Sequence, residues 1–225
     1  MKIRFSCPPE LTDLLPQPKL ARRTTPDWYK QMPMDNPTGE GPDDLTVKHC
    51  LPFIDALTLG FVIPLQADVT VKNGEFTWDW PHDESPVGFH YPTQAPGVPF
   101  VDSDVVVIKA HNFWSIHTEP GYATLFTHPL NRHDLPFRTL SGLVDTDGFD
   151  SLPVHFPMMW IDPDFEGVLP AGTPVAQCIP VERARLDLEI ETMGTDEYAE
   201  ARALKEKIKN ERGYYKTHIR RPDFD

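Results

Sequence analysis

The sequence predicts a mainly β protein, in which short strands are joined by long ordered loops. The 225-residue chain contains 25 prolines, and proline disfavours helix interiors and central strands because it lacks a backbone donor. Its 40% apolar and 11% aromatic content is sufficient for a real core at this length. Several short alternating or β-branched runs also recur between turn signals, which is typical of a sandwich or barrel.

The first 50 residues are rich in proline, polar residues and charge. Trp28, Tyr29 and Met32 supply apolar contact points, so we expect an ordered arm that lies on the body of the protein. The stretch 35–44 combines proline and glycine, and this composition predicts a loop.

Regular structure is predicted to begin after this arm. The short apolar run Ile54–Leu59 suits one or two helical turns, and Phe61–Val71 reads as a strand interrupted at Pro64. Asn73-Gly74 then separates this strand from the alternating run 76–80. Asn and Gly tolerate positive φ at both positions of a tight turn, so this is the strongest hairpin signal in the chain.

Residues from about 105 to 182 are predicted to form a compact β-rich core around the turn Ser141–Asp147, after a loop over 81–99. The predicted core strands are Val105–Ile108, Phe113–His117, Tyr122–Thr127, Arg138–Val144, Leu152–Trp160 and Pro174–Val181. Alternation of Leu186, Leu188 and Ile190 predicts one more strand.

The chain changes character at its C-terminal end, where we predict one helix over 195–212. Thr195 is suited to the helix start and Gly213 to its end. Ala201, Leu204 and Ile208 share one face. The predicted organisation is therefore a Pro-rich arm over 1–50, a β-rich core domain over 51–192, and a C-terminal helix and tail over 193–225.

Charge and cysteine content narrow the class of function. A formal net charge of −13 repels phosphate backbones, so general nucleic-acid binding is not expected. Cys7, Cys50 and Cys178 form no CxxC pair, which favours a reducing compartment. No signal peptide and no membrane-spanning run is evident, so we expect a cytoplasmic protein with no membrane partner.

Three strings occur in a characteristic order: Pro120–Tyr122, Gly142–Asp147 and Leu169–Val181. In these the chain resembles the dUTPase and dCTP deaminase superfamily, over roughly a third of its length. The second string is similar to that family's "Gly-x-Ile-Asp-x-Asp-Tyr" turn and the third to its "Pro-Gly-Asp-x-Ile-Ala-Gln" turn. The resemblance implies a β-clip fold, which is a distorted jelly-roll barrel, and a homo-oligomer, because such relatives commonly form trimers.

The resemblance also implies site residues. Asp145 matches the aspartate that orients a water for attack on a nucleoside triphosphate, and Asp147 follows it in the same turn. Gln177 matches the glutamine near the phosphates. The remaining residues expected to bind the ligand are Arg132, Asn131 and Tyr122, and the implied cofactor is Mg²⁺.

The chain departs from the family in three places, and one of them is Gly148-Phe149, which replaces the family's tyrosine after the second aspartate. His128–Arg132 stands where the family has "Arg-Ser-Gly", and a helix and the tail 214–221 replace the Gly-rich C-terminal arm. The leading expectation is therefore a small-molecule binding protein or hydrolase, with a nucleotide as one candidate ligand. A second resemblance, over Trp28–Lys30, Val47–Phe53 and 120–147, is to uncharacterised proteins of bacteria and tailed phages, and it implies no activity.

The histidines supply a rival prediction. Neutral imidazole is a common ligand of iron and zinc, and cupin-like barrels bind such metals through histidines and a carboxylate. The cofactor would then be a histidine-bound transition metal, held with Asp145 or Asp147 by histidines of the β-core: His111, His117, His128 and His155. The third alternative is a non-enzymatic oligomeric binding or structural module.

Overall fold

The computed structural model describes residues 1–38, 45–91, 94, 106–149 and 151–221. Parts of the two predicted loops, and the first residue of the predicted strand at Val105, lie outside these ranges. The chain divides into two compact units, Met1–Arg183 and Ala184–Asp225, which are described separately. The sequence predicted three segments, with limits at 50 and 192, whereas the structure has two units that meet at 183. The division into three domains stays a prediction.

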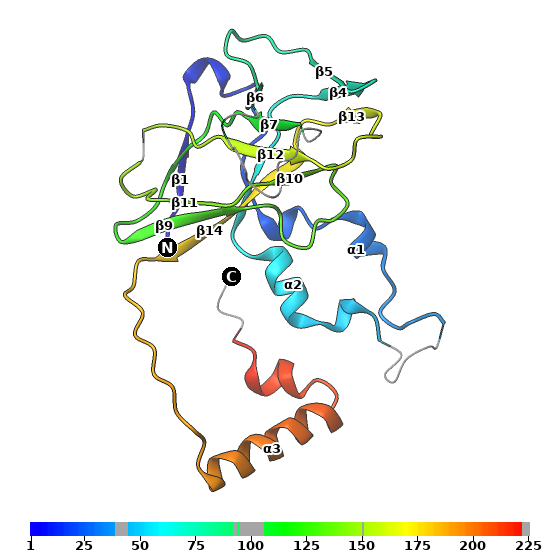
Figure 1. The fold of residues 1–225 in the computed structure, drawn as a ribbon, viewed down its shortest axis with the longest axis vertical. Helices are drawn as coiled ribbons and strands as arrows, with labels where there is room; N and C mark the ends of the chain where they lie inside the picture. Colours follow the sequence, from blue (N-terminus) through cyan, green and yellow to red (C-terminus); the bar gives the residue numbers. More distant parts are fainter. Residues whose placement is uncertain (39–44, 92–93, 95–105, 150, 222–225) are drawn as a thin grey trace. The chain divides into compact units, whose positions relative to one another are not determined.

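The largest sheet of the first unit has five antiparallel strands in the order β11–β9–β14–β3–β2 (Figure 1). Its strands are Gly142–Val144, Tyr122–Thr127, Pro174–Glu182, Phe61–Pro64 and Lys19–Leu20. The predicted strands at β9 and β14 are confirmed. The nine-residue β14 is the longest strand and pairs with β9 over its C-terminal half.

The second sheet has four antiparallel strands in the order β10–β12–β7–β6. Its strands are Phe137–Thr139, Phe156–Trp160, Val107–Ala110 and Val87–Phe89. The prediction of one strand over Arg138–Val144 is wrong, because β10 and β11 belong to different sheets. Leu140 N still donates to Pro157 O at 2.9 Å, and the Ser141 hydroxyl already donates to Thr127 Oγ1 at 3.1 Å.

A three-stranded sheet of order β13–β4–β5 contains Gly167–Leu169, Val69–Lys72 and Glu75–Trp78. The predicted hairpin is confirmed, since Lys72 pairs with Glu75 across the turn. Asn73 and Gly74 have φ of 50° and 74°, and these values are what a two-residue hairpin turn of the primed type requires.

The N-terminal segment is ordered against the body. β1 (Arg4–Ser6) pairs with β8 (Ser115–His117) in a two-stranded sheet. Leu11 and Leu15 pack in a small cluster with Phe113 and Trp114. Burial of these side chains stabilises the arm on the body, at about 25 cal/mol per Å² of apolar surface removed from water.

Short helices complete the first unit. The α-helices are α1 (Asp27–Gln31) and α2 (Leu51–Thr58), and the 3₁₀ turns are η1 (Pro9–Leu11), η2 (Ala21–Arg23) and η3 (Val47–His49). The predicted helical turns before Gly60 are therefore confirmed. Among all described residues, no helix combines the length and apolar character needed to cross a bilayer.

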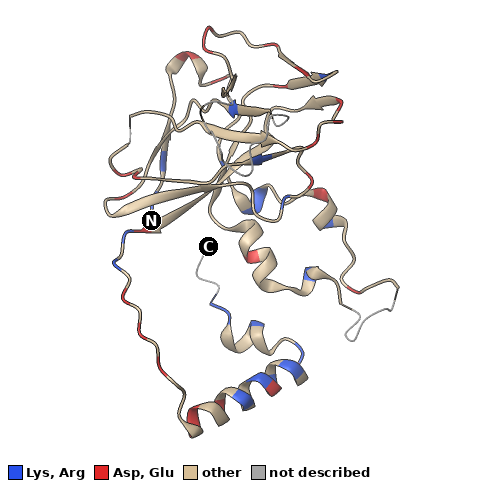
Figure 2. Ribbon diagram, in the orientation of Figure 1, with Lys and Arg blue, Asp and Glu red and all other residues tan. Residues whose placement is uncertain are grey.

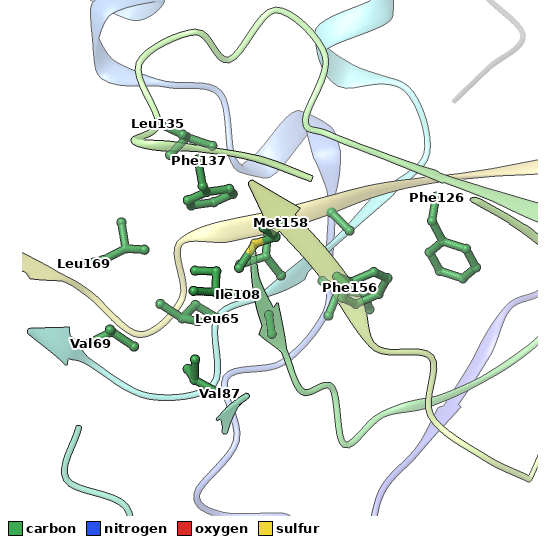
Figure 3. Packing of buried hydrophobic residues seen from close by; sticks show 14 of the residues in the cluster. Leu65, Val69, Val87, Ile108, Phe126, Leu135, Phe137, Phe156, Met158 and Leu169 are labelled. Carbon is green, nitrogen blue, oxygen red and sulfur yellow. The ribbon is translucent and has the colours of Figure 1, made fainter. Parts of the chain in front are cut away.

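The main core lies between the sheets, and Figure 3 shows how side chains from β4, β7, β9, β10 and β12 meet there. Phe137 and Ile63 have no exposed surface, and Phe126 packs against Phe156 with ring centroids 5.4 Å apart. The prediction of a mainly β protein is confirmed, with antiparallel sheets throughout. Within the described residues, the strand orders do not close into a barrel.

The second unit contains α3 (Thr195–Asn210) and a π-helical turn, η5 (Tyr215–Ile219). The predicted C-terminal helix is confirmed, although it ends two residues early. The predicted strand over 186–190 is wrong: Leu186, Leu188 and Ile190 are 84%, 86% and 96% exposed and pair with no described strand. Alternating apolar residues show which side chains a strand would bury. The strand itself forms only where the edge of a sheet is free to pair with it.

Candidate functional site

The turn after β11 carries two aspartates that share one arginine. Arg183, the last residue of the first unit, donates from Nη1 to Oδ1 of Asp145 and to Oδ1 of Asp147, both at 2.9 Å. Its Nη2 donates to Oδ2 of Asp147. Asp145 stays 72% exposed, whereas Asp147 is only 12% exposed.

The turn is anchored between these two aspartates by Thr146, which is fully buried. Its hydroxyl lies 2.8 Å from Thr118 Oγ1 and 2.7 Å from Thr124 Oγ1. Asp147 also accepts from the amide of Gly121 at 2.9 Å. The Arg183 hydrogen bonds, followed by the Gly121 amide, hold the pKa of Asp147 below its usual value.

This arrangement limits the chemistry of the turn. A carboxylate with a lowered pKa accepts a proton poorly, so Asp147 is not suited to be a general base. One oxygen of Asp145 is held by Arg183, and the other accepts no hydrogen bond from the residues that the structure describes. The cluster therefore closes the turn onto the end of β14.

Gln177 is buried in β14 and has a structural set of partners. Its Oε1 accepts from the amide of Leu130 at 2.8 Å, and its Nε2 donates to the carbonyls of Ala56 and Leu59 at 2.9 and 2.6 Å. Gln177 has only 1% of its surface exposed. Its side-chain amide joins the C-terminal end of α2 and the loop after β9 to the central strand.

The other predicted ligand-binding residues lie in different places. Asn131, with φ of 60°, donates from Nδ2 to the carbonyl of Phe53 at 3.3 Å. Tyr122 begins β9 and pairs with Glu182 at the far end of β14. Arg132 lies on an open depression at the other end of that strand, near Pro174.

This depression has a cavity volume of about 470 Å³, and we call it the basic depression. Three elements meet there: the segment from η2 to α1, the loop after β9, and the turn before β14. Its lining consists of Arg23, Thr24, Thr25, Pro26, Asp27, Trp28, Lys30, Arg132, Asp134, Gly172 and Pro174.

Two of its three cations already have carboxylate partners. Lys30 Nζ contacts Asp27 at 3.0 Å, and Arg132 holds Asp134 through Nε at 2.8 Å and Nη2 at 2.9 Å. Although burial raises the pKa of Asp134, the hydrogen bonds and charge of Arg132 lower it overall. Arg23 lines the depression with no ion pair to a described residue.

The turns at 142–147 and 169–177 are far apart within one chain. The Gly172 turn lies at the beginning of β14, and Arg183, with its two aspartates, follows the end of that strand. At about 3.3 Å per residue, Pro174 and Glu182 are separated by roughly 25 Å. One small ligand therefore cannot contact both turns of the same copy.

The four predicted metal-ligating histidines occupy three places. His111 and His155 lie together, with ring centroids 4.7 Å apart. His128 contacts the carbonyl of Arg132 through Nε2 at 2.8 Å, and His117 contacts Ser6 and Arg4 at 2.9 and 3.2 Å. Among the residues that the structure describes, no group of three His, Cys, Asp or Glu is placed to hold a metal.

The hydrogen bonds of the His111–His155 pair constrain their tautomers. His111 Nδ1 lies 2.6 Å from the carbonyl of Ser85 and must donate, which leaves a lone pair on Nε2. This buried Nε2 has no described partner. His155 Nδ1 accepts from the amide of Asn112 at 3.2 Å, so its Nε2 carries the proton. Only His111 then offers a free lone pair.

Sequence reasoning identified Arg132 but missed the other cations of the basic depression, Arg23 and Lys30. The available signal was the run Leu20–Lys30, in which two arginines, two threonines and an aromatic pair precede the lysine. The sequence predicted this run only as part of the N-terminal arm. A search for similar proteins adds no name to this site, since no family model and no curated protein matches the chain.

Proposed function

We propose that this protein binds a small anionic molecule in the basic depression, with a nucleotide as the leading candidate. The observation that carries the proposal is the convergence of Arg23, Lys30 and Arg132 beside the Gly172 turn. A volume of about 470 Å³ suits a ligand of this size, since small-molecule sites commonly span about 300–1,000 Å³.

The donors of the depression define the ligand chemistry. Arg23 is available for a phosphate or carboxylate, and such charge-assisted hydrogen bonds are stronger than neutral ones. Lys30 would exchange Asp27 for the ligand. Thr24 and Thr25 donate their hydroxyl protons to the carbonyls of Ala21 and Arg22, so they offer the ligand acceptors, which suit the hydroxyls of a sugar.

Trp28 supplies an aromatic surface at the same place. It lines the depression, and its ring meets those of Tyr29 and Phe53 edge-on. The Trp28 side chain is only half-buried, and base–aromatic stacking contributes about 1–3 kcal/mol. A ligand that combines an anionic group, hydroxyls and a planar ring therefore matches the lining.

The finer fold and the hydrolase chemistry remain parts of this proposal. The ordered match of the turns at 142–147 and 169–177 supports a β-clip fold, as does the antiparallel pairing of β9, β11 and β14. Hydrolysis by Asp145 with Mg²⁺ would require a second copy to bring its turn to the basic depression, because the two places are distant within one chain. We therefore propose ligand binding as the main function and hydrolysis as a secondary one.

Calorimetric titration with dUTP, dCTP, inorganic pyrophosphate and uncharged uridine tests the binding proposal. We expect heat with the anions and a much weaker response to uridine, because Arg23 and the two exchangeable cations, Lys30 and Arg132, have no charge to pair with on uridine. Absence of binding by all three anions would overturn it.

Two variants locate the site. Arg23→Ala should weaken anion binding by about tenfold or more, because one charge-assisted hydrogen bond is lost. Lys72→Ala is the matched control, since Lys72 is exposed on β4 and does not line the depression. Equal affinity of wild type and Arg23→Ala would exclude the basic depression as the binding place.

A further inference from the structure

The second unit carries an unusual amount of exposed apolar surface. No residue of α3 is buried, and its large apolar side chains are well exposed: Tyr198 at 57%, Leu204 at 42% and Ile208 at 42%. Monomeric proteins seldom expose contiguous apolar stripes of this kind. We therefore expect the stripe of Tyr198, Leu204 and Ile208 to be covered by another protein surface.

The stripe has the spacing of a two-helix seam. Ala201, Leu204 and Ile208 follow one another at intervals of three and four, which is the alternation that packs one helix against another. Glu200 and Lys207 lie seven residues apart and flank the seam on the same side. Seven residues return a helix to nearly the same face, so both point along one edge of the seam.

Charge is distributed unevenly along α3. Figure 2 shows acidic residues at its beginning and mostly basic residues toward its end. The acidic residues at the start are Asp196, Glu197 and Glu200, and the basic residues that follow are Arg202, Lys205, Lys207 and Lys209. An antiparallel neighbour with the same sequence would place each acidic end beside a basic end.

From this complementarity we infer that α3 associates with α3 of a second copy, as an antiparallel helix pair centred on Leu204. In this arrangement Glu200 of each copy faces Lys207 of the other, which gives two ion pairs. Leu204 packs on its own counterpart, and Ile208 packs on Ala201 of the second copy. Antiparallel packing also opposes the two helix dipoles favourably.

The same geometry predicts a weak, concentration-dependent dimer. The next seam positions outward are Glu197 and Glu211, so only the layers from Ala201 to Ile208 are apolar. Glu197 is turned toward the helix start, where it accepts from the amide of Gly194 at 3.3 Å. Lys205, on the other flank, faces its counterpart and opposes association.

A parallel pair would use a different charge contact. It would bring Glu200 of each copy against Lys205 of the other, because flanking positions five residues apart meet in parallel pairs. One substitution therefore separates the two directions: Lys207→Glu weakens an antiparallel pair but leaves the Glu200–Lys205 contact of a parallel pair in place.

Sedimentation velocity of the full chain over a wide range of concentration tests the inference. We expect a reversible monomer–dimer equilibrium that Leu204→Asp abolishes. Ala203→Asp, on the opposite face of α3, is the matched control and should leave the equilibrium unchanged. A wild type that stays monomeric at every concentration, or association that survives Leu204→Asp, would overturn it.

Charge reversal tests the antiparallel direction. Glu200→Lys and Lys207→Glu should each raise the dissociation constant by about tenfold, and the double variant should restore it. Glu206→Lys, which reverses a charge away from the seam, should have little effect. Tighter association of Lys207→Glu, or no rescue by the double variant, would contradict the antiparallel pair.

Discussion

The amide of Leu130 donates to Oε1 of Gln177 at 2.8 Å and so joins the loop after β9 to the central strand. The side-chain amide of the same glutamine donates to the carbonyls of Ala56 and Leu59. Gln177 thus satisfies three backbone groups that belong to two different segments. In this structure the Gln177 side chain therefore holds the fold together.

Gln177→Leu should therefore destabilise the protein by about 3 kcal/mol, because three backbone groups lose their partners in a largely buried place. Urea denaturation gives the free energy of unfolding. Gln17→Leu is the matched control, since Gln17 is exposed, and it should change stability by less than about 0.5 kcal/mol. Equal stability of the two variants would show that water replaces the lost partners.

Two glycines with positive φ should differ sharply in their tolerance of a methyl group. A Cβ at Gly60 (φ 69°) would lie 2.2 Å from the carbonyl oxygen of Cys178, whereas a Cβ at Gly172 (φ 88°) meets nothing within 4 Å. Gly172→Ala should cost only the backbone strain, about 1–2 kcal/mol. Gly60→Ala must also displace the backbone of β14, so we expect more than about 3 kcal/mol or failure to fold.

Thermal unfolding of both glycine variants, followed by circular dichroism, measures this difference. The comparison isolates the steric effect because both positions share the unfavourable φ. Similar midpoints for Gly60→Ala and Gly172→Ala would mean that the loop after α2 moves away from β14 without cost.

The sequence predicted those elements whose signal is local. The Asn73-Gly74 turn was recognisable because only a few residue types adopt positive φ at both positions. Likewise, β9 and β14 are long apolar runs, and α3 shows both a favourable beginning and a repeating face. The strands β6 and β13 were missed because each has three residues and lies in a segment dominated by turn residues.

Other features depend on tertiary structure and are invisible in local patterns. The run 186–190 alternates like a strand, yet nothing local states whether a sheet edge will accept it. The division of 138–144 between two sheets depends on the partners of Leu140 and Ser141. Gln177 was expected to lie near the phosphates of a ligand, whereas its partners in the structure are backbone groups 47 and 121 positions away in sequence.

The candidate site also combines a residue that the sequence predicted with residues that only the tertiary structure reveals. Arg132 was expected to bind a ligand because of the resemblance at 128–132, and it does line the basic depression. Arg23 and Lys30 reach the same place from a segment more than a hundred residues earlier, and only the packed fold brings them together. The two aspartates of the turn share a partner, Arg183, that the sequence did not indicate.

The Asp147–Arg183 pair should make stability depend on pH in the acidic range. The pKa of Asp147 lies below its ordinary value of 3.8 in the folded protein. Its contribution to stability is therefore fully present above that value and is lost as pH falls through the folded pKa. Arg183→Gln should weaken this dependence, because the largest cause of the lowered pKa is gone while the Gly121 amide remains.

Urea midpoints measured from neutral pH down to about pH 3 test this expectation. Wild type should lose more stability over the acidic part of the range than Arg183→Gln. Arg185→Gln, which removes a charge from the adjacent segment, serves as the control and should behave like wild type. Parallel pH profiles for wild type and Arg183→Gln would show that the pair does not shift the pKa of Asp147.

His155 should produce a second pH dependence closer to neutrality. Burial, and then the neighbouring His111 and Lys109, lower the pKa of His155 below 6.5 in the folded protein. The unfolded chain therefore binds a proton first as pH falls, so stability is greatest above about 6.5 and declines until the folded pKa is passed. Burial also lowers the pKa of His128, which adds to the effect in the same direction.

His155→Gln should flatten this decline, because glutamine keeps an acceptor for the amide of Asn112 but does not titrate. The free energy of unfolding, measured between about pH 7.5 and about pH 5, reports the change in slope. His218→Gln, at an exposed histidine of the second unit, should leave the slope as in wild type. An unchanged slope in His155→Gln would mean that this ring is protonated as readily in the folded protein as in the unfolded chain.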